Sequence, residues 1–362
     1  MEVALQHSIR NPDNIVAVLG FNNAAVDIFF CLSAFTLCLV YRAGACRSFN
    51  FVQYAVARLA RVYPLYAVVL GFVTVTTLAF GSNGYSAYSE GAAFADWVRQ
   101  ALAINALPII GTGNFWAPPM WSLSIEVFCY FAIFPLLFAA TPVLRRASAG
   151  TLAIVILSAV AGDLALYLLF YDPRINTHWL VAIHLTPLAH WVAIGRGVFM
   201  FIAGWASYCL FKFQPEAVSR FSSLFRFLVL ALVILFILAA MKLVDTQWML
   251  LAMPFVIVRV ATDEGAAAEL LSSRPIYMLG VVSFSIYLWH VPFQDLADQF
   301  WPEMVGWVRL FVFLPFCIVA SFASFAMIER PARRFLKERA VLLAPLYAAE
   351  ARTVATAGES RR

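Results

Sequence analysis

Long apolar runs recur along the chain, separated by short polar or Pro/Gly-rich breaks. A helix needs about 20 mostly apolar residues to cross the ~30 Å hydrocarbon core of a bilayer. Such runs follow one another from Ala24 to Ile328, and they predict an all-α, polytopic transmembrane helix bundle with about nine spans. The predicted spans are residues 24–41, 62–80, 121–140, 151–170, 196–212, 224–242, 247–262, 276–296 and 306–328.

The composition strengthens this prediction. Hydrophobic residues make up 63% of the 362 positions and charged residues only 12%, against about 25% charged in soluble domains. A water-soluble single domain cannot hide so much apolar surface. The six cysteines lie mostly inside apolar runs and lack metal-ligand spacing, so we interpret them as small core residues and expect no metal site.

The distribution of charge predicts how the chain is oriented. The formal net charge is +5, but the basic residues form short clusters between spans, which is typical of loops facing anionic lipid and argues against nucleic-acid binding. The basic loops and the C-terminal tail are expected in the cytoplasm, and the segments with few cations on the other side. The basic loops are 42–61, 141–150 and 213–226; the other segments are 81–120, 171–195, 243–246 and 297–305.

These assignments also predict the domain organisation. Nine spans counted back from a cytoplasmic tail leave residues 1–23 outside without a span of their own, so we expect that most of a first helix is missing from this start. Residues 1–340 are predicted to form a single transmembrane domain, and residues 341–362 a partly disordered cytoplasmic tail. The expected location is the cell membrane, as in a bacterial inner membrane.

Arg58 and Arg61 stand three residues apart before the second predicted span. On a helix this spacing puts both guanidinium groups on one face, where they can hold phosphate oxygens by charge-assisted hydrogen bonds. The alternative is a positive-inside anchor whose side chains reach lipid headgroups.

The third predicted span begins with Trp121–Glu126, directly after two prolines. Its serines, Ser122 and Ser124, are favourable helix starters, and Glu126 lies about one turn inside. A carboxylate there costs on the order of 2–3 kcal/mol or more unless it is paired, protonated or in contact with water, so Glu126 is a functional candidate. A simple helix-start acid is the alternative.

His290 follows Tyr287 and precedes Pro292 near the end of the eighth predicted span. It is either a base or an interfacial histidine that orients its neighbours. Asp27 opens the first span and either orients a histidine, pairs with an arginine or acts as a helix-start acid.

Three more histidines recur at intervals of six residues in an outer segment. They fall on different helix faces and predict an amphipathic interfacial segment rather than a metal site. These residues are His178, His184 and His190.

The order of the motifs resembles that of the polytopic acyltransferase-3 family, whose members transfer acyl groups onto sugars and similar acceptors. The matching blocks span nearly the whole chain and are Val26–Phe35, Arg58–Pro64, Trp121–Glu126, Gly280–His290 and Glu329–Pro331. In that family an essential histidine precedes the first block by about twenty residues, and His7 stands at this distance before Asp27. The arginine that the family usually carries before this histidine has no counterpart here, in agreement with a missing helix.

The resemblance implies a membrane-bound O-acyltransferase that moves an acyl group, expected to be acetyl, from acyl-CoA to a hydroxyl of a carbohydrate or glycolipid acceptor. It implies that His7 is a general base or a transient acyl carrier, with Glu126 or Asp27 orienting its imidazole. Arg58 and Arg61 then hold the phosphates of the donor, which is a substrate, and no permanently bound cofactor is expected. Further candidates are Ser122, Ser124, Tyr287 and His290.

Two other classes of function fit part of the pattern. A secondary transporter or flippase would use the buried charges as a path, but the chain shows no inverted repeat and its arginine pair lies at the rim. A structural or sensor protein without chemistry is the other class. For the transferase, acceptor choice is expected in segments 81–120 and 171–195, whose aromatic residues suit stacking on sugar rings.

Overall fold

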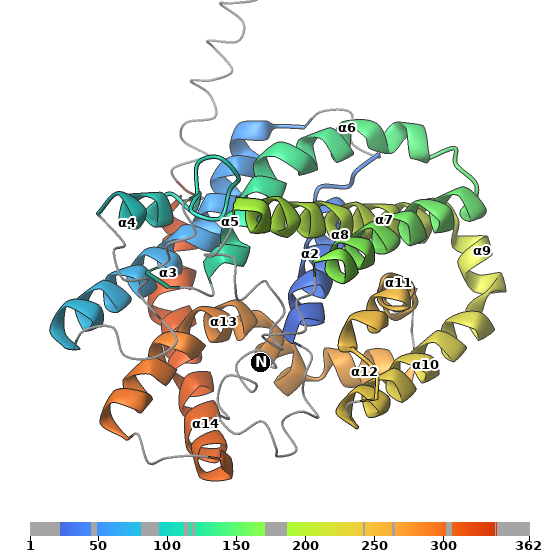
Figure 1. Ribbon diagram of the computed structural model, residues 1–362. Coiled ribbons are helices and arrows are strands. Elements are labelled where there is room, and N and C mark those ends of the chain that lie inside the picture. Colours follow the sequence, from blue (N-terminus) through green and yellow to red (C-terminus); the bar gives the residue numbers. More distant parts are fainter. Residues whose placement is uncertain are drawn as a thin grey trace, which may run out of the picture.

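A computed structural model describes most of the helical part of the chain (Figure 1). The described residues are 22–44, 49–80, 94–111, 116–117, 120–170, 187–241, 243–262, 265–301, 306–336 and 338. His7, the predicted first helix and residues 341–362 lie outside them.

Helices are the only regular elements of the described residues. In chain order they are α2 (Asn22–Val40), α3 (Phe51–Phe80), α4 (Phe94–Ala101), α5 (Trp121–Phe128), the π-helical turn η3 (Cys129–Ile133), α6 (Phe134–Leu144), α7 (Ala149–Leu169), α8 (Pro187–Phe213), α9 (Pro215–Arg220), α10 (Ser222–Ala240), the 3-10 turn η4 (Thr246–Leu251), α11 (Met253–Thr262), α12 (Ala266–Ser272), α13 (Arg274–Phe300), α14 (Gly306–Ser324) and the π-helical turn η5 (Phe325–Glu329).

The apolar helices coincide with the predicted spans. Six of the described helices are long and apolar enough to cross a bilayer, judged by length and composition, and three shorter apolar helices fall on the remaining predicted spans. Large apolar side chains stay exposed, such as Leu78 at 76% and Phe311 at 71%, as expected for a surface solvated by lipid. The all-α polytopic bundle is therefore confirmed.

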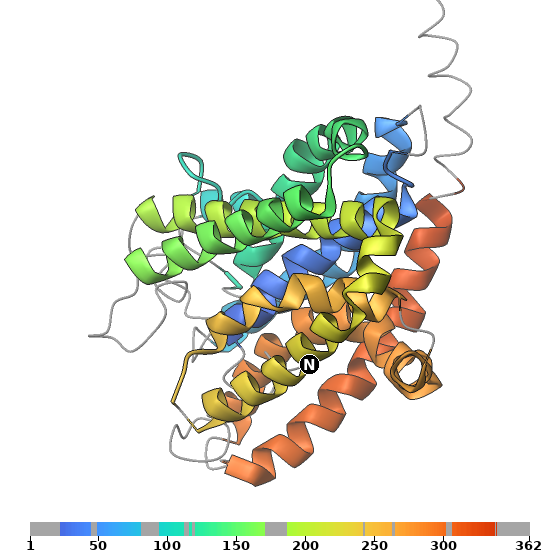
Figure 2. The same ribbon diagram turned by 90° about the vertical axis from the view of Figure 1, so that its right-hand side faces the viewer.

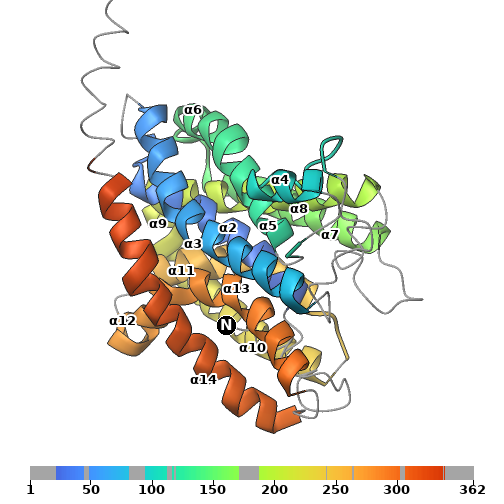
Figure 3. The ribbon, with the colours of Figure 1, turned by 90° about the vertical axis from the view of Figure 1, so that its left-hand side faces the viewer.

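Helix α2 lies in the middle of the bundle (Figure 1). It packs against α8, and α8 packs in turn along α7, so that α7 and α8 run side by side in Figures 1 and 2. On the other side, α13 packs against α14 and α3 (Figure 3). Helix α5 packs against α8. The candidate residues thus lie on several helices that pack together in the bundle.

The contact between α2 and α8 depends on a glycine. A Cβ atom added at Gly204 would lie 1.9 Å from the carbonyl oxygen of Cys31 and 3.0 Å from Ala34 Cβ. Small residues allow this close approach of two backbones, as is common between helices in membranes. The approach also sets the position of Ser33, which lies in the same turn of α2.

Substitution of Gly204 by alanine is expected to lower the free energy of unfolding by about 1–3 kcal/mol, because the added methyl group pushes α2 from α8. Gly71→Ala in α3 is the matched control, since its added Cβ would meet nothing within 4 Å. The control should be neutral or stabilising by up to about 1 kcal/mol. Thermal unfolding of the detergent-purified variants measures both, and equal effects would contradict the close packing.

Helix α3 begins earlier than predicted. The sequence suggested a loop up to residue 61, but the helix starts at Phe51 and contains Arg58 and Arg61. Arg, Leu and Ala are strong helix formers, and Tyr54 is fully buried, so packing extends the helix beyond the apolar run. The prediction of a loop is therefore wrong for residues 51–61.

Two other predictions fail for local reasons. The predicted span 247–262 is broken into η4 and α11, because Pro254 has no N–H to continue a helix from residue 250 and Asp245 caps the start of η4. Helix α8 begins at Pro187, so His190 is a buried helical residue, 3% exposed, and does not lie on the exposed face of an amphipathic segment. His178 and His184 lie outside the described residues.

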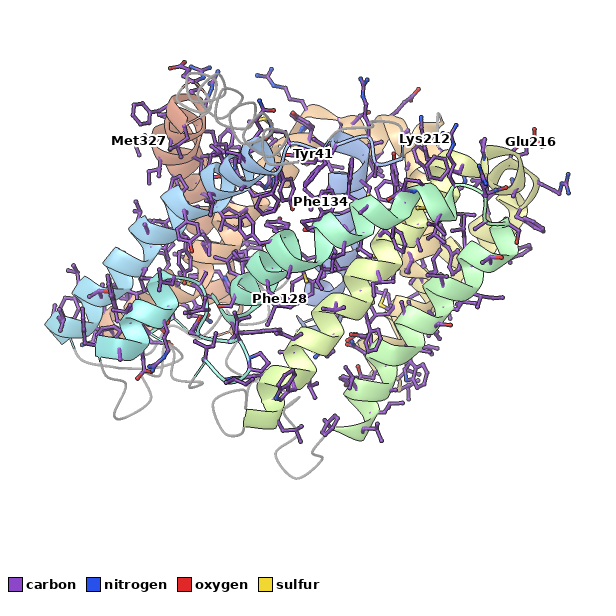
Figure 4. The ribbon with its side chains drawn as sticks, turned by 90° about the horizontal axis from the view of Figure 1, so that it is seen from above. Tyr41, Phe128, Phe134, Lys212, Glu216 and Met327 are labelled. Carbon is purple, nitrogen blue, oxygen red and sulfur yellow. The ribbon has the colours of Figure 1, made fainter. Side chains whose placement is uncertain are left out.

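One end of the bundle collects segments that the sequence assigned to the same side. Figure 4 shows Tyr41, Lys212, Glu216 and Met327 along one edge of the molecule. These residues lie just after α2, near the end of α8, in α9 and in η5. Their common position agrees with the predicted alternation of the loops.

Candidate functional site

Glu126 is the centre of a polar group inside the bundle. Its side chain belongs to the second turn of α5 and is 3% exposed. The Oε1 atom accepts hydrogen bonds from Ser33 Oγ, at 3.3 Å, and from the hydroxyl of Tyr130. Both hydrogen bonds end on Oε1, and neither involves the second carboxylate oxygen, Oε2. Burial with partners from two helices makes Glu126 more than a helix-start acid.

The local helix geometry places Tyr130 beside this carboxylate. Residues four apart share a helix face, and Tyr130 follows Glu126 by four. The chain then makes the π-helical turn η3, a feature that often occurs at functional sites. Tyr54 of α3 donates its hydroxyl to the Tyr130 carbonyl at 2.9 Å, and its ring stacks on Phe134 with centroids 5.0 Å apart. These contacts hold α3 against the site.

The two arginines of α3 approach the same carboxylate. Arg58 and Arg61 both lie close enough to Glu126 for their positive charges to act on it. The Arg58 guanidinium carbon lies 5.7 Å from the ring centre of Tyr41 and 5.9 Å from that of Tyr130. Its Nε atom is buried and has no hydrogen-bond partner among the described residues. A buried cationic donor without a partner is suited to binding an anion.

Ser122 lies one helical turn before Glu126, on the same face of α5. Ser122 Oγ and the hydroxyl of Tyr287 in α13 form a 2.7 Å hydrogen bond, and Tyr287 lies close enough to Glu126 to respond to its charge. His290 is fully buried, and its Nδ1 atom contacts the backbone carbonyl of Tyr287. The structure thus joins Ser122 and Tyr287 to the group around Glu126, and His290 adjoins Tyr287 on the same helix.

Ser124 belongs to different surroundings. It lies two residues from Ser122, about 200° around the helix axis. Its hydroxyl donates to Asn105 Oδ1 at 2.7 Å, and both residues are fully buried. Ser124 therefore ties the segment after α4 to α5 and is not brought to Glu126.

Asp27 belongs to a second buried group. It forms an ion pair with Arg196 of α8 and accepts a 2.5 Å hydrogen bond from Gln247 Nε2. Asp163 of α7 lies 3.5 Å from Arg196 Nε and 3.2 Å from Gln247 Nε2. All four residues are at most 3% exposed. Asp27 is separated from Ser33 by about 9 Å along α2, and the structure shows the predicted alternative in which it pairs with an arginine.

The sequence missed several members of these groups. Tyr130 could have been found from its spacing to Glu126, and Ser33 lies in the same block as Asp27. Gln247 gives no such signal, because its partner lies 220 positions away in the sequence.

Comparison with known proteins identifies the family. A family model described as an acyltransferase domain matches residues 3–328. The chain belongs to the acyltransferase-3 family. The match covers most of the 362 residues, includes His7 and contains both buried polar groups. No curated protein and no solved structure matches the chain.

This member of the acyltransferase-3 family is a membrane acyltransferase. Family membership decides against the transporter and sensor alternatives. The described residues contain no cluster of three or more His, Cys, Asp or Glu side chains that could hold a metal ion. They do contain a buried carboxylate, hydroxyl groups and two guanidinium groups in one place, which are groups that can bind an anion and direct a proton.

Proposed function

We propose that this acyltransferase moves an acyl group, expected to be acetyl, from acyl-CoA to a hydroxyl of a carbohydrate or glycolipid acceptor. The observation that carries this proposal is the buried, unpartnered Nε atom of Arg58, whose guanidinium group lies 5.9 Å from the ring of the tyrosine that donates to Glu126. A site for the donor's phosphates would then adjoin a group that can direct proton transfer.

Donor binding is supported by the chemistry of the arginines. Guanidinium groups form paired, charge-assisted hydrogen bonds with phosphate oxygens, and coenzyme A carries several phosphates. An anchor for lipid headgroups would reach outward, whereas Arg58 packs near Tyr41 and Tyr130 with its Nε atom buried. We assign the nucleotide end of the donor to the cytoplasmic side, where the basic loops and the C-terminal tail are expected.

The proposed reaction needs one base. The acceptor oxygen attacks the thioester carbonyl carbon, the C–S bond breaks, and coenzyme A leaves as a thiolate. His7 takes the proton from the acceptor hydroxyl and returns it to the leaving sulfur. In the other route a His7 nitrogen attacks the thioester and coenzyme A leaves as a thiolate; the acceptor oxygen then displaces neutral His7 from the acyl group, and the acceptor proton passes to the thiolate. The assignment of His7 comes from the sequence, since this residue lies outside the described ranges.

Glu126 is the carboxylate that suits the positioning role. Its Oε2 atom receives neither of the bonds from Ser33 and Tyr130 and can accept an N–H from an imidazole, which would fix the tautomer of the base. Asp27 suits this role less well, because Arg196 and Gln247 already bind its carboxylate.

Acceptor recognition is proposed in the outer segments. In α4 the rings of Phe94 and Trp97 stack with centroids 6.0 Å apart, and Phe94 is 75% exposed. Trp97 is held by a 2.8 Å hydrogen bond from its Nε1 atom to Thr74 Oγ1. The exposed ring of Phe94, stacked on the fixed ring of Trp97, suits contact with a sugar ring.

Binding and turnover of radiolabelled acetyl-CoA by the purified protein in nanodiscs test this function. The wild-type protein should bind the label and transfer or hydrolyse the acetyl group. The double variant Arg58→Gln/Arg61→Gln should bind at least 100-fold more weakly, since each charge-assisted hydrogen bond contributes about 1.5–3 kcal/mol. Arg146→Gln, an exposed arginine in a basic loop, is the control. Equal affinity of the double variant and the control would overturn the donor site.

A further inference from the structure

The C-terminal end of the last span brings a third guanidinium group to the arginines of α3. Helix α3 packs against η5, the π-helical turn that ends at Glu329. Arg333 follows one turn later, and both Arg61 and Arg58 lie close enough to repel its charge. Figure 4 places Met327 of η5 at the same end of the bundle as Tyr41, which packs against Arg58.

Glu329 and Phe325 hold Arg333 near the arginines of α3, despite the repulsion between the positive charges. Its Nη2 atom pairs with Glu329 Oε2, and the other carboxylate oxygen of Glu329 accepts a hydrogen bond from Ser285 of α13. Glu329 is only 1% exposed, and the guanidinium carbon lies 5.7 Å from the ring centre of Phe325. A buried carboxylate with partners on two helices is a fixed support for the arginine and not a surface pair.

The charge of this group is not balanced by its own members. Arg333 pairs with Glu329, and the charges of Arg58 and Arg61 act on both Arg333 and Glu126, so three guanidinium groups lie near two carboxylates. The Nε atoms of Arg58 and Arg333 are both buried and have no partner among the described residues. Like charges brought together with buried donors still free are stabilised by an anion with several acceptor oxygens.

We propose that Arg333 is a third ligand of the donor's phosphates and that Glu329 and Ser285 are its positioning residues. This inference rests on the proposed donor site at Arg58 and Arg61. It assigns a binding role to a residue beyond the Glu329–Pro331 block and explains why a buried acid lies at the end of the last span. Helix α3 and the segment after η5 would then contribute ligands to one phosphate site.

Direct binding of radiolabelled acetyl-CoA to the full-length protein in nanodiscs tests this role. Arg333→Gln should weaken binding about 10-fold to 100-fold, as expected for the loss of one charge-assisted hydrogen bond of about 1.5–3 kcal/mol. Arg334→Gln is the matched control, because it removes the same charge from an exposed neighbouring position. Arg333→Lys keeps the charge and should recover part of the affinity.

Competition by acetyl-pantetheine, which keeps the thioester but lacks the nucleotide phosphates, separates binding from a structural role. Its inhibition constant should be the same for the wild-type protein and Arg333→Gln. Glu329→Gln should likewise weaken acetyl-CoA and spare acetyl-pantetheine. Equal weakening of both ligands in Arg333→Gln would show a structural role and overturn the inference.

The Arg58→Gln variant distinguishes a failure of the role proposed for Arg333 from a failure of the proposed donor site. If Arg58→Gln weakens acetyl-CoA binding while Arg333→Gln behaves like Arg334→Gln, the role of Arg333 is wrong and the proposed function stands. If neither Arg58→Gln nor Arg333→Gln changes the affinity, the donor site itself is wrong, and the inference fails with it.

Discussion

Replacement of His7 by alanine should lower the rate of acyl transfer by about 10²–10⁴-fold, the usual contribution of a positioned general base. Without the imidazole, no group takes the proton of the acceptor hydroxyl or protonates the leaving sulfur. The affinity for acetyl-CoA should stay unchanged, because His7 is not among the proposed phosphate ligands Arg58, Arg61 and Arg333. Release of the coenzyme A thiol from acetyl-CoA, with and without a panel of sugars, measures the rate.

Gln6→Ala is the control for this prediction, since it changes a neighbouring polar residue and leaves the imidazole in place. It should retain nearly full activity. A His7→Ala variant with the activity of the control would remove His7 from the mechanism, and binding of labelled acetyl-CoA would show that the variant is folded. Loss of binding together with loss of turnover would instead indicate a structural role for His7.

The spans were predictable because each forms one apolar run. Helices α7 (Ala149–Leu169) and α10 (Ser222–Ala240) differ from the predicted spans 151–170 and 224–242 by only one or two residues at each end. The prediction failed where a helix continues through polar residues, as in α3. It also failed where a proline and a capping aspartate break an apolar run, as between η4 and α11. Hydrophobicity finds the lipid-crossing part of a helix but not its polar extensions.

The sequence was sufficient to single out most residues of the candidate site, but it only partly predicted which of them lie together. Embedded charge singled out Glu126, and spacing singled out Arg58 and Arg61. Their common location depends on how α3 packs against the turn after α5, through the Tyr54 hydroxyl and the Tyr130 carbonyl, and a single sequence carries no signal for that contact. The same holds for Arg333, which the positive-inside pattern explains equally well as a cytoplasmic anchor.

The separation of the two carboxylates has a physical cause that the sequence does not reveal. Asp27 and Glu126 were both assigned to the orientation of a histidine. Asp27 meets the cation Arg196 on α8, whereas Glu126 meets the hydroxyls of Ser33 and Tyr130. A carboxylate fixed by an ion pair serves to lock helices together, and one held by hydroxyls keeps an oxygen for another donor.

Arg196→Met should be the most destabilising of the substitutions considered. The variant leaves Asp27 and Asp163 buried without a cation, which costs about 3–5 kcal/mol in free energy of unfolding. Arg196 also joins α8 to α2 and α7, so its loss should loosen the contact that sets the position of Ser33 beside Glu126. Thermal unfolding in detergent and acetyl-CoA turnover at a temperature well below the transition measure the two effects.

Asp163→Asn is the informative counterpart, because it removes one of the two acids and leaves the pair of Asp27 with Arg196 intact. Three buried charges then become two, so this variant should change the free energy of unfolding by no more than about 1 kcal/mol. A large loss in Arg196→Met with a small change in Asp163→Asn is the signature of a cation that holds two acids. If both variants lose the same stability, the group acts through packing and hydrogen bonds alone. Asp27 would then be as free as Glu126 to orient a catalytic histidine, and the preference for Glu126 in the proposed mechanism would lose its basis.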